Sequence, residues 1–324
     1  TIFSFLKQKF LQILLLPILG ICIFVGPYFS FLNNKIYIEP MTFDIKKGST
    51  SSQILNNISK DPNPIEIIFI KLFLTLNSGN YQSGEYEVSN KSLIDIHNQI
   101  IDGNTVTHQI TVVPGMNKYD IDNLINNSFL INDCQYLNCI QSDYNFTEGM
   151  ILPDTYYYKK GMKSSLLLKR SSADLMEFVE SIWTTKPPTN PLKSIKDSLI
   201  LASIVEKEAG NELEKNKIAA VFLKRLSIKM KLQADPTIIY GLMPNFDGDI
   251  KKSNIKDKKN PYNTYVIKSL PPTPIAVSSK SSIEASILSE PGEYLFFVAN
   301  KKGSHYFSKT YNEHLEAVKL YQLK

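Results

Sequence analysis

The sequence predicts an α+β protein with an N-terminal transmembrane helix, a small α+β subdomain and a larger mixed α+β domain. Three observations support this prediction. Residues 11–32 form an apolar run, residues 36–110 alternate between strand and helix patterns, and residues 111–324 carry several amphipathic helices and a hairpin. A chain of 324 residues has room for an anchor and about two domains.

The apolar run LQILLLPILGICIFVGPYFSFL, residues 11–32, has about the 20 residues that a helix needs to cross a bilayer core. Lys7 and Lys9 precede it and only Lys35 follows closely, so the positive-inside rule predicts a cytoplasmic tail for residues 1–10. A cleaved signal peptide is the alternative. The long run and the absence of a small-residue cleavage site after it favour a single-pass anchor, with the remaining chain outside the cytoplasm.

The smaller domain, residues 36–110, is predicted from alternating residues, caps and turn signals. Ser92 is a helix N-cap, and Gly103 is the expected C-terminal stop of the same helix. The expected elements are a strand over 36–47, helices over about 52–58, 65–76 and 93–102, and strands over 84–88 and 105–113.

The larger domain, residues 111–324, is predicted to be a mixed α+β domain. Asn211 and Thr310 each begin a capping-box sequence, and the prolines of 186–191 end a long helix. The expected elements are helices over about 118–127, 164–184 and 194–210, a helix restarting after 211, a hairpin of 294–299 with 305–308, and a last helix over 310–321.

Composition and charge exclude several functions. The net charge is only +5, and aspartates interrupt the lysines of residues 251–259, so nucleic acid is not an expected partner. No spacing of histidines and cysteines suggests a metal site, and we expect neither a metal nor a cofactor. Cys134 and Cys139 either pair in an oxidising compartment or remain two free buried thiols.

The stretch L-A-S-I-V-E-K-E-A-G, residues 201–210, places Glu206 and Glu208 after an apolar run. Residues two apart on a helix differ by about 200°, so the two acids cannot form one dyad. Apolar neighbours and the negative end of the helix dipole would raise the pKa of Glu208, which suits a general acid. On the residues alone, the simpler alternative is that both glutamates point outward with Lys207.

Six motifs in register resemble the endolytic murein transglycosylase family, the YceG-like proteins. They are E-G-M-I-L-P-D-T-Y (148–156), L-A-S-I-V-E-K-E-A (201–209), L-K-R-L-S-I-K-M-K-L-Q-A-D-P-T-I-I-Y-G (223–241), P-Y-N-T-Y (261–265), L-P-P-T-P-I-A (270–276) and F-F-V-A-N-K-K-G-S-H-Y-F-S-K-T-Y-N-E-H (296–314). The resemblance covers most of the chain from about residue 40 onward. In addition, F-D-I-K-K-G-S-T-S-S-Q-I (43–54) is similar to the opening of a LysM glycan-binding module, which implies a LysM-like subdomain within 36–110.

The resemblance implies a lytic transglycosylase that cleaves the MurNAc–GlcNAc bond within nascent peptidoglycan strands and leaves 1,6-anhydroMurNAc ends. Glu208 matches the family's catalytic glutamate and would act first as general acid and then as base. The implied partners are peptidoglycan glycan strands, the inner membrane and peptidoglycan synthases. The implied location is the cell inner membrane, with the N-terminus cytoplasmic and the catalytic domain, residues 111–324, periplasmic.

Further residues match family motifs and are expected to bind sugars through amide, hydroxyl and aromatic groups, with a loop-fixing role as the alternative for each. They are Gln233, Asp235, Thr237, Tyr240, Tyr262, Asn263 and Thr264. For His305, packing in the hairpin is favoured over sugar contact. Ser269 and Ser279 stand where family members usually have glycine, which affects the expected conformation of that loop.

Two other functions are compatible with the sequence. The first is a membrane-anchored glycan-binding or division-scaffold protein with a degenerate site, which would have the motifs but no catalytic activity. A hydrolase using a second carboxylate, such as Asp235, would release reducing ends instead of anhydro ends.

Overall fold

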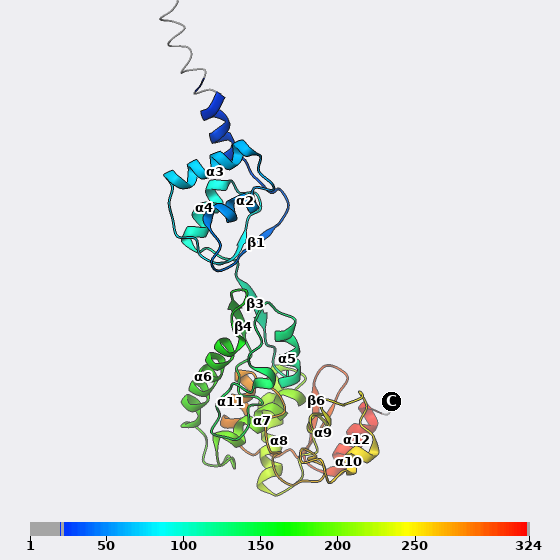
Figure 1. Ribbon diagram of the computed structural model, residues 1–324. Coiled ribbons are helices and arrows are strands. Elements are labelled where there is room, and N and C mark those ends of the chain that lie inside the picture. The colour runs from blue at the N-terminus through cyan, green and yellow to red at the C-terminus, as the bar shows by residue number, and fades with distance from the viewer. Residues whose placement is uncertain (1–19, 21–22, 323–324) are drawn as a thin grey trace, which may run out of the picture. The chain divides into compact units, whose positions relative to one another are not determined.

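The computed structural model describes residue 20 and residues 23–322. The chain divides into two compact units, Thr1–His108 and Gln109–Lys324 (Figure 1). The predicted cytoplasmic tail, residues 1–10, and most of the predicted transmembrane run lie outside the described residues.

The described end of the predicted transmembrane run, residues 23–32, is helical and packs partly against the rest of the first unit. Tyr28 and Leu32 are buried, and the Tyr28 ring meets Phe69 edge-on with ring centroids 5.4 Å apart. Within the described ranges, no helix combines the length and the apolar character needed to cross a membrane. The anchor therefore stays a prediction.

The first unit is built on one antiparallel pair of strands, in which Phe43 lies opposite Tyr86. Its elements are β1 (Thr42–Ile45), α2 (Ser51–Ile58), α3 (Pro64–Leu76), β2 (Gly84–Glu87) and α4 (Leu93–Asp102). The predicted strand over 36–47 is shorter than expected, and Pro40, which lacks an N–H group, precedes its start. The predicted caps of α4 are confirmed, since Ser92 accepts from the Asp95 backbone and Gly103 is left-handed at φ 69°. The LysM resemblance stays a prediction.

The second unit holds the remaining elements. They are β3 (His108–Thr111, whose first residue ends the first unit), α5 (Lys118–Asn126), the 3₁₀ turn η1 (Gln135–Leu137), β4 (Thr155–Tyr158), α6 (Ser164–Trp183), α7 (Ile195–Glu208), the 3₁₀ turn η2 (Glu212–Glu214), α8 (Lys215–Ser227), α9 (Asp235–Leu242), α10 (Lys252–Lys256), α11 (Lys280–Leu288), β5 (Phe296–Ala299), β6 (His305–Ser308) and α12 (Tyr311–Tyr321). The capping box at Thr310 and the β5–β6 hairpin are as predicted. The mixed α+β architecture is therefore confirmed, with small two-stranded sheets.

Helix α7 lies at the centre of this unit and packs against α6, α8 and α11 (Figure 1). Every residue from Ser198 to Val205 is buried. Leu199 and Ala202 belong to one hydrophobic core, whereas Leu201, Ile204 and Val205 belong to a second core. A helix that is apolar on all sides is buried on all sides by its neighbours. The carboxyl end of α7 therefore lies in the middle of the second unit.

Candidate active site

A cavity of about 420 Å³ opens at the carboxyl end of α7. Segments that are far apart in the sequence form its walls: α7 and α8, the start of α9, the β5–β6 hairpin and α12. Its lining residues are Glu208, Arg225, Gln233, Asp235, Tyr265, Phe296, Phe297, Val298, Ala299, His305, Tyr311, His314, Val318 and Gln322.

Glu208 is the last residue of α7, and its side chain enters the cavity half-buried. The helix ends two residues before the end of the predicted helix over 194–210, because Ala209 has extended backbone angles. Gly210 serves a different purpose, since a Cβ atom there would lie 3.1 Å from the carbonyl oxygen of Gly303. Glycine at this position lets the β5–β6 turn approach the end of α7.

The electrostatic surroundings of Glu208 favour its protonated form. Burial, first, and the negative charge of Asp235, second, raise the pKa of Glu208 to about 7, and the positive charge of Arg225 offsets part of this effect. Among the described residues, no side chain or backbone group forms a hydrogen bond with its carboxyl group. The group is therefore free to exchange a proton with a molecule in the cavity near neutral pH.

Arg225 is a buried cation fixed behind this carboxyl group. Its Nε donates to the Leu295 carbonyl oxygen at 2.8 Å, and its Nη1 donates to the Leu232 carbonyl oxygen. Burial lowers the pKa of Arg225 to about 10, and the charge of Glu208 opposes that change. Arg225 thus stays positive at neutral pH and can stabilise the carboxylate form of Glu208 once its proton has left.

The hairpin supplies the opposite side of the cavity. His305 is held by Glu214, which accepts from its backbone N–H at 2.7 Å and lies 3.0 Å from Nδ1. Its ring meets Phe297 edge-on, with centroids 5.4 Å apart. His305 therefore packs within the hairpin, as favoured from the sequence, while it also lines the cavity.

Two of the predicted sugar-binding residues share this cavity with Glu208. Gln233 and Asp235 are exposed and line it, and Asp235 accepts a hydrogen bond of 2.7 Å from the Tyr265 hydroxyl. Gln233 is held in the left-handed region at φ 53°. A non-glycine residue in this region is uncommon and often marks a constrained site.

Three predicted sugar-binding residues are fully buried and hold loops instead. Asn263 donates through its amide to the carbonyl oxygens of residues 254, 255 and 257. The hydroxyls of Thr237 and Thr264 lie 2.9 Å apart, and Thr264 also accepts from the backbone of residue 234. With no exposed surface, these side chains do not face the cavity. Thr237 and Thr264 fix the segment that carries Gln233 and Asp235, and Asn263 fixes the loop over residues 254–257.

The remaining two, Tyr240 and Tyr262, lie together beside another carboxylate, which the sequence reasoning did not select. Their rings meet edge-on, with centroids 4.9 Å apart. The Tyr240 hydroxyl donates at 2.8 Å to Glu148, which also accepts from the backbone N–H of Lys118 at 3.1 Å. Burial raises the pKa of Glu148 to about 7 against these donors. The feature of the sequence that could have indicated Glu148 is its position as the first residue of the motif E-G-M-I-L-P-D-T-Y.

The loop in which Ser279 stands is ordered by the other glutamate of α7. Glu206 accepts from the Ser279 backbone at 2.9 Å and from the Ser282 hydroxyl at 2.6 Å, and it forms an ion pair of 3.4 Å with buried Lys215. Ser279 is also the N-cap of α11. Serine at this position is thus compatible with a well-formed loop, and Glu206 has a structural role.

The cavity combines one protonatable carboxyl group with a fixed cation, exposed amide and carboxylate groups, and aromatic walls. This set suits general acid–base chemistry on a neutral polar molecule. In the part of the chain that the structure describes, no cluster of three or more histidine, cysteine, aspartate or glutamate side chains could hold a metal ion.

Comparisons with known proteins show which sequences this chain resembles. The model of the YceG-like family matches residues 43–320. An endolytic murein transglycosylase of Bacillus subtilis (strain 168) is 28% identical over 330 residues, which cover 90% of each chain. A protein of the same name from Streptococcus pneumoniae serotype 2 (strain D39 / NCTC 7466) is 29% identical over 173 residues, which are 52% of this chain but only 31% of that relative.

The fold also has a solved counterpart. The crystal structure of a yceG-like protein from Listeria monocytogenes superposes with a TM-score of 0.52 at 26% identity, covering 86% of this chain and 99% of the other.

Proposed function

The chain belongs to the YceG-like family, and on that premise we propose that it is a lytic transglycosylase that cleaves peptidoglycan strands internally. The similar proteins of Bacillus subtilis and Streptococcus pneumoniae are named endolytic murein transglycosylases. The observation that carries the proposal is the carboxyl group of Glu208, which has a pKa of about 7 and no hydrogen-bond partner among the described residues, in a cavity of about 420 Å³.

The proposed reaction needs one carboxyl group used twice. Protonated Glu208 donates its proton to the glycosidic oxygen between MurNAc and GlcNAc, and the bond from that oxygen to C1 breaks. The C6 hydroxyl of the same MurNAc then attacks C1 and gives its proton to Glu208. A 1,6-anhydroMurNAc end and a free GlcNAc hydroxyl result, no water is consumed, and Glu208 is protonated again.

The neighbours of Glu208 fit both halves of this cycle. Burial and the Asp235 charge keep the proton on Glu208 before cleavage, whereas the nearby Arg225 cation stabilises the carboxylate between the two proton transfers. A pKa near 7 makes both forms accessible at neutral pH.

A second candidate is hydrolysis, and the presence of Asp235 in the same cavity favours it. In an inverting hydrolase, a second carboxylate activates a water molecule and a reducing MurNAc end results. Asp235 is engaged with the Tyr265 hydroxyl, which supports an electrostatic role for it instead.

The test is a digest of purified peptidoglycan with the full chain, read by mass spectrometry. We expect anhydro ends from the wild type, their loss in Glu208→Gln, and unchanged products from Glu284→Gln, which alters an exposed acid outside the cavity. Products with reducing ends would show that the reaction is hydrolysis and not transglycosylation. Full activity of Glu208→Gln would remove Glu208 from the mechanism, and no cleavage by any form would favour the glycan-binding alternative.

We further propose that residues 11–32 anchor the protein in the inner membrane, with the catalytic unit on the periplasmic side near peptidoglycan synthases. Support comes from the apolar run itself and from the Cys134–Cys139 disulfide, a bond typical of oxidising compartments. Reporter fusions at either end of the full chain would test the orientation, and a cytoplasmic C-terminal reporter would contradict it.

A further inference from the structure

A pair of tyrosines lies outside the cavity and has no part in the proposed chemistry. Tyr136 is 50% exposed, and its ring meets that of Tyr119 edge-on with centroids 5.6 Å apart. Tyr119 stands in the first turn of α5 and is half-buried. Tyr136 presents its ring and phenol group to solvent, whereas the Lys118 ammonium group lies 5.2 Å from the centre of the Tyr119 ring. An exposed tyrosine of this kind suits contacts with partly polar ligands.

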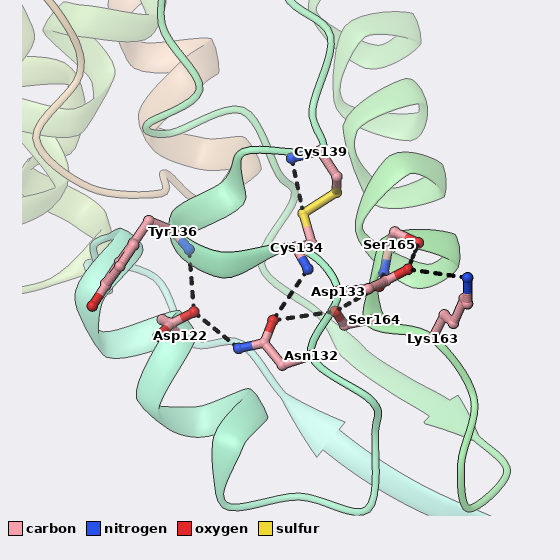
Figure 2. Close-up of a disulfide and its surroundings, with 9 residues drawn as sticks. All are labelled: Asp122, Asn132, Asp133, Cys134, Tyr136, Cys139, Lys163, Ser164 and Ser165. Carbon is pink, nitrogen blue, oxygen red and sulfur yellow. Dashed lines mark hydrogen bonds and ion pairs between the residues drawn. A yellow bond between two sulfur atoms is a disulfide. The ribbon is translucent and has the colours of Figure 1, made fainter.

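A disulfide-closed loop carries Tyr136. Cys134 and Cys139 are bonded across the 3₁₀ turn η1, and Figure 2 shows the surrounding hydrogen bonds. The buried carboxylate of Asp122 on α5 accepts from the Tyr136 backbone N–H at 3.1 Å and from the Asn132 amide at 3.0 Å. The loop is thus fastened to α5 at its centre and closed by the disulfide at its base.

The backbone of this loop turns the aromatic ring outward. Tyr136 and Leu137 both lie in the left-handed region, at φ 50° and φ 64°. Leu137 is buried in the core, while Tyr136 projects beside α5 (Figure 2). Left-handed backbone angles at two consecutive non-glycine residues are energetically unfavourable. Backbone strain of this kind clusters at active sites and ligand-binding sites.

Glu148 connects this pair to the tyrosines near the cavity. The backbone of Lys118, adjacent to Tyr119, and the hydroxyl of Tyr240 both donate to the Glu148 carboxylate, at 3.1 Å and 2.8 Å. The phenol of Tyr119 is also near enough to affect the pKa of both Tyr240 and Tyr262. The four tyrosines Tyr136, Tyr119, Tyr240 and Tyr262 form what we define as the tyrosine row.

The row lies beside the proposed catalytic residue. Lys207, which precedes Glu208, donates to the carbonyl oxygen of Gly115 at 3.2 Å, just before α5 and Tyr119. At the other side, Tyr240 is on α9, the helix whose first residue, Asp235, lines the cavity. These two contacts connect the row to the segments that carry Glu208 and Asp235.

We propose that the tyrosine row is an extended subsite that binds sugar rings of a glycan strand beyond the cleaved bond, and that the disulfide loop positions Tyr136 as its outer platform. This inference rests on the proposed function for the identity of the ligand. The row makes no contact with the reacting atoms, so its contribution is to the binding of long strands.

The test compares a tetrasaccharide with long uncross-linked glycan strands as substrates of the full chain. Tyr136→Ala is expected to raise KM for long strands by about three- to tenfold, the loss typical of one aromatic contact, and to leave kcat and the tetrasaccharide KM unchanged. Tyr136→Phe keeps the ring and is expected to behave as wild type. Tyr157→Ala, at a 69% exposed tyrosine on β4, is the matched control. An unchanged KM for long strands in Tyr136→Ala would overturn the proposal.

A binding measurement separates this inference from the proposed function. In the Glu208→Gln background, titration with long glycan strands should show the same loss of affinity when Tyr136 is replaced by alanine, whatever reaction the wild type catalyses. If Tyr136→Ala weakens strand binding but the wild type cleaves no strands, only the proposed transglycosylase activity is refuted. If the wild type cleaves strands but Tyr136→Ala has no effect on binding, only the subsite is refuted. If neither cleavage nor a Tyr136 effect is observed, both proposals are refuted. The double variant Cys134→Ser/Cys139→Ser should reproduce the Tyr136→Ala effect, and a wild-type KM for it would overturn the positioning role of the disulfide.

Discussion

Replacing Glu208 with glutamine is expected to change how the stability of the second unit depends on pH. The pKa of Glu208 is about 7 in the folded protein, against an ordinary value of 4.5. The folded protein therefore holds this proton more tightly than the unfolded chain. The stability contributed by the group is fully present below pH 4.5 and is lost as the pH rises through 7. Glutamine preserves the shape and does not titrate.

The magnitude follows from the shift from 4.5 to about 7. At about 1.36 kcal/mol per pKa unit, the complete shift corresponds to about 3.4 kcal/mol of unfolding free energy. Between pH 5 and pH 8 the loss is about 2.5 kcal/mol, because part of it has already occurred at pH 5. The Glu208 side chain is only half-buried, so contact with solvent makes this an upper value.

The assay is urea unfolding at pH 5 and pH 8, followed by the fluorescence of Trp183, the only tryptophan of the chain. Trp183 ends α6 and packs against both cores of the second unit, so it reports the unit that contains Glu208. Glu148, whose pKa is also about 7, titrates in both proteins and cancels from the difference. An equal loss of stability in wild type and Glu208→Gln would show that Glu208 has an ordinary pKa and would refute the reasoning.

Three further predictions concern the surroundings of Glu208. Asp235→Asn removes the second cause of its raised pKa, so the basic limb of the kcat/KM profile should move to lower pH by a fraction of a unit; an unmoved limb would contradict the coupling. Asn263→Ala leaves three partly buried carbonyl oxygens without their amide donor and should destabilise the second unit by about 1–3 kcal/mol in urea unfolding, whereas an unchanged stability would argue against the loop-fixing role. Lys215→Met should cost about 3–5 kcal/mol because it leaves the largely buried Glu206 charge without its cation, and adding Glu206→Gln should recover part of that loss; no recovery would mean that the two residues are not coupled.

The helices of the fold could be predicted where local chemistry marks their ends. Ser92 and Gly103 bound α4 through a side-chain cap and a left-handed glycine, and Thr310 starts α12, as the sequence indicated. Helix α11 was missed because its serine-rich sequence, K-S-S-I-E-A-S-I-L, resembles a loop. Its local signal is the N-cap Ser279, and the helix packs against α7, a contact that the sequence does not show. Strand β4 was also missed.

The candidate site was predictable in part. The resemblance selected Glu208, Gln233 and Asp235, which the structure brings into one cavity. The raised pKa of Glu208 was expected from burial, and burial is indeed its largest cause. The second cause, Asp235, and the opposing cation, Arg225, could not be foreseen, because each acts across space from another segment. Charged residues that come together only in the folded protein form no recognisable spacing pattern in the sequence.

The two glutamates of α7 illustrate why one motif needs both acids. Glu206 is saturated by donors: a backbone N–H, two serine hydroxyls and the Lys215 ammonium group. These bonds tie the last turn of α7 to α8 and to the start of α11. Glu208, on the opposite side of the same turn, lacks any such partner among the described residues and faces the cavity. A general acid needs a rigidly held backbone and a carboxyl group without hydrogen-bond partners. One carboxyl group cannot both form the bonds that hold the turn and remain without partners. Glu206 fixes the turn so that Glu208 can remain free, which is why their divergence by about 200° is a requirement of the site and not an obstacle to it.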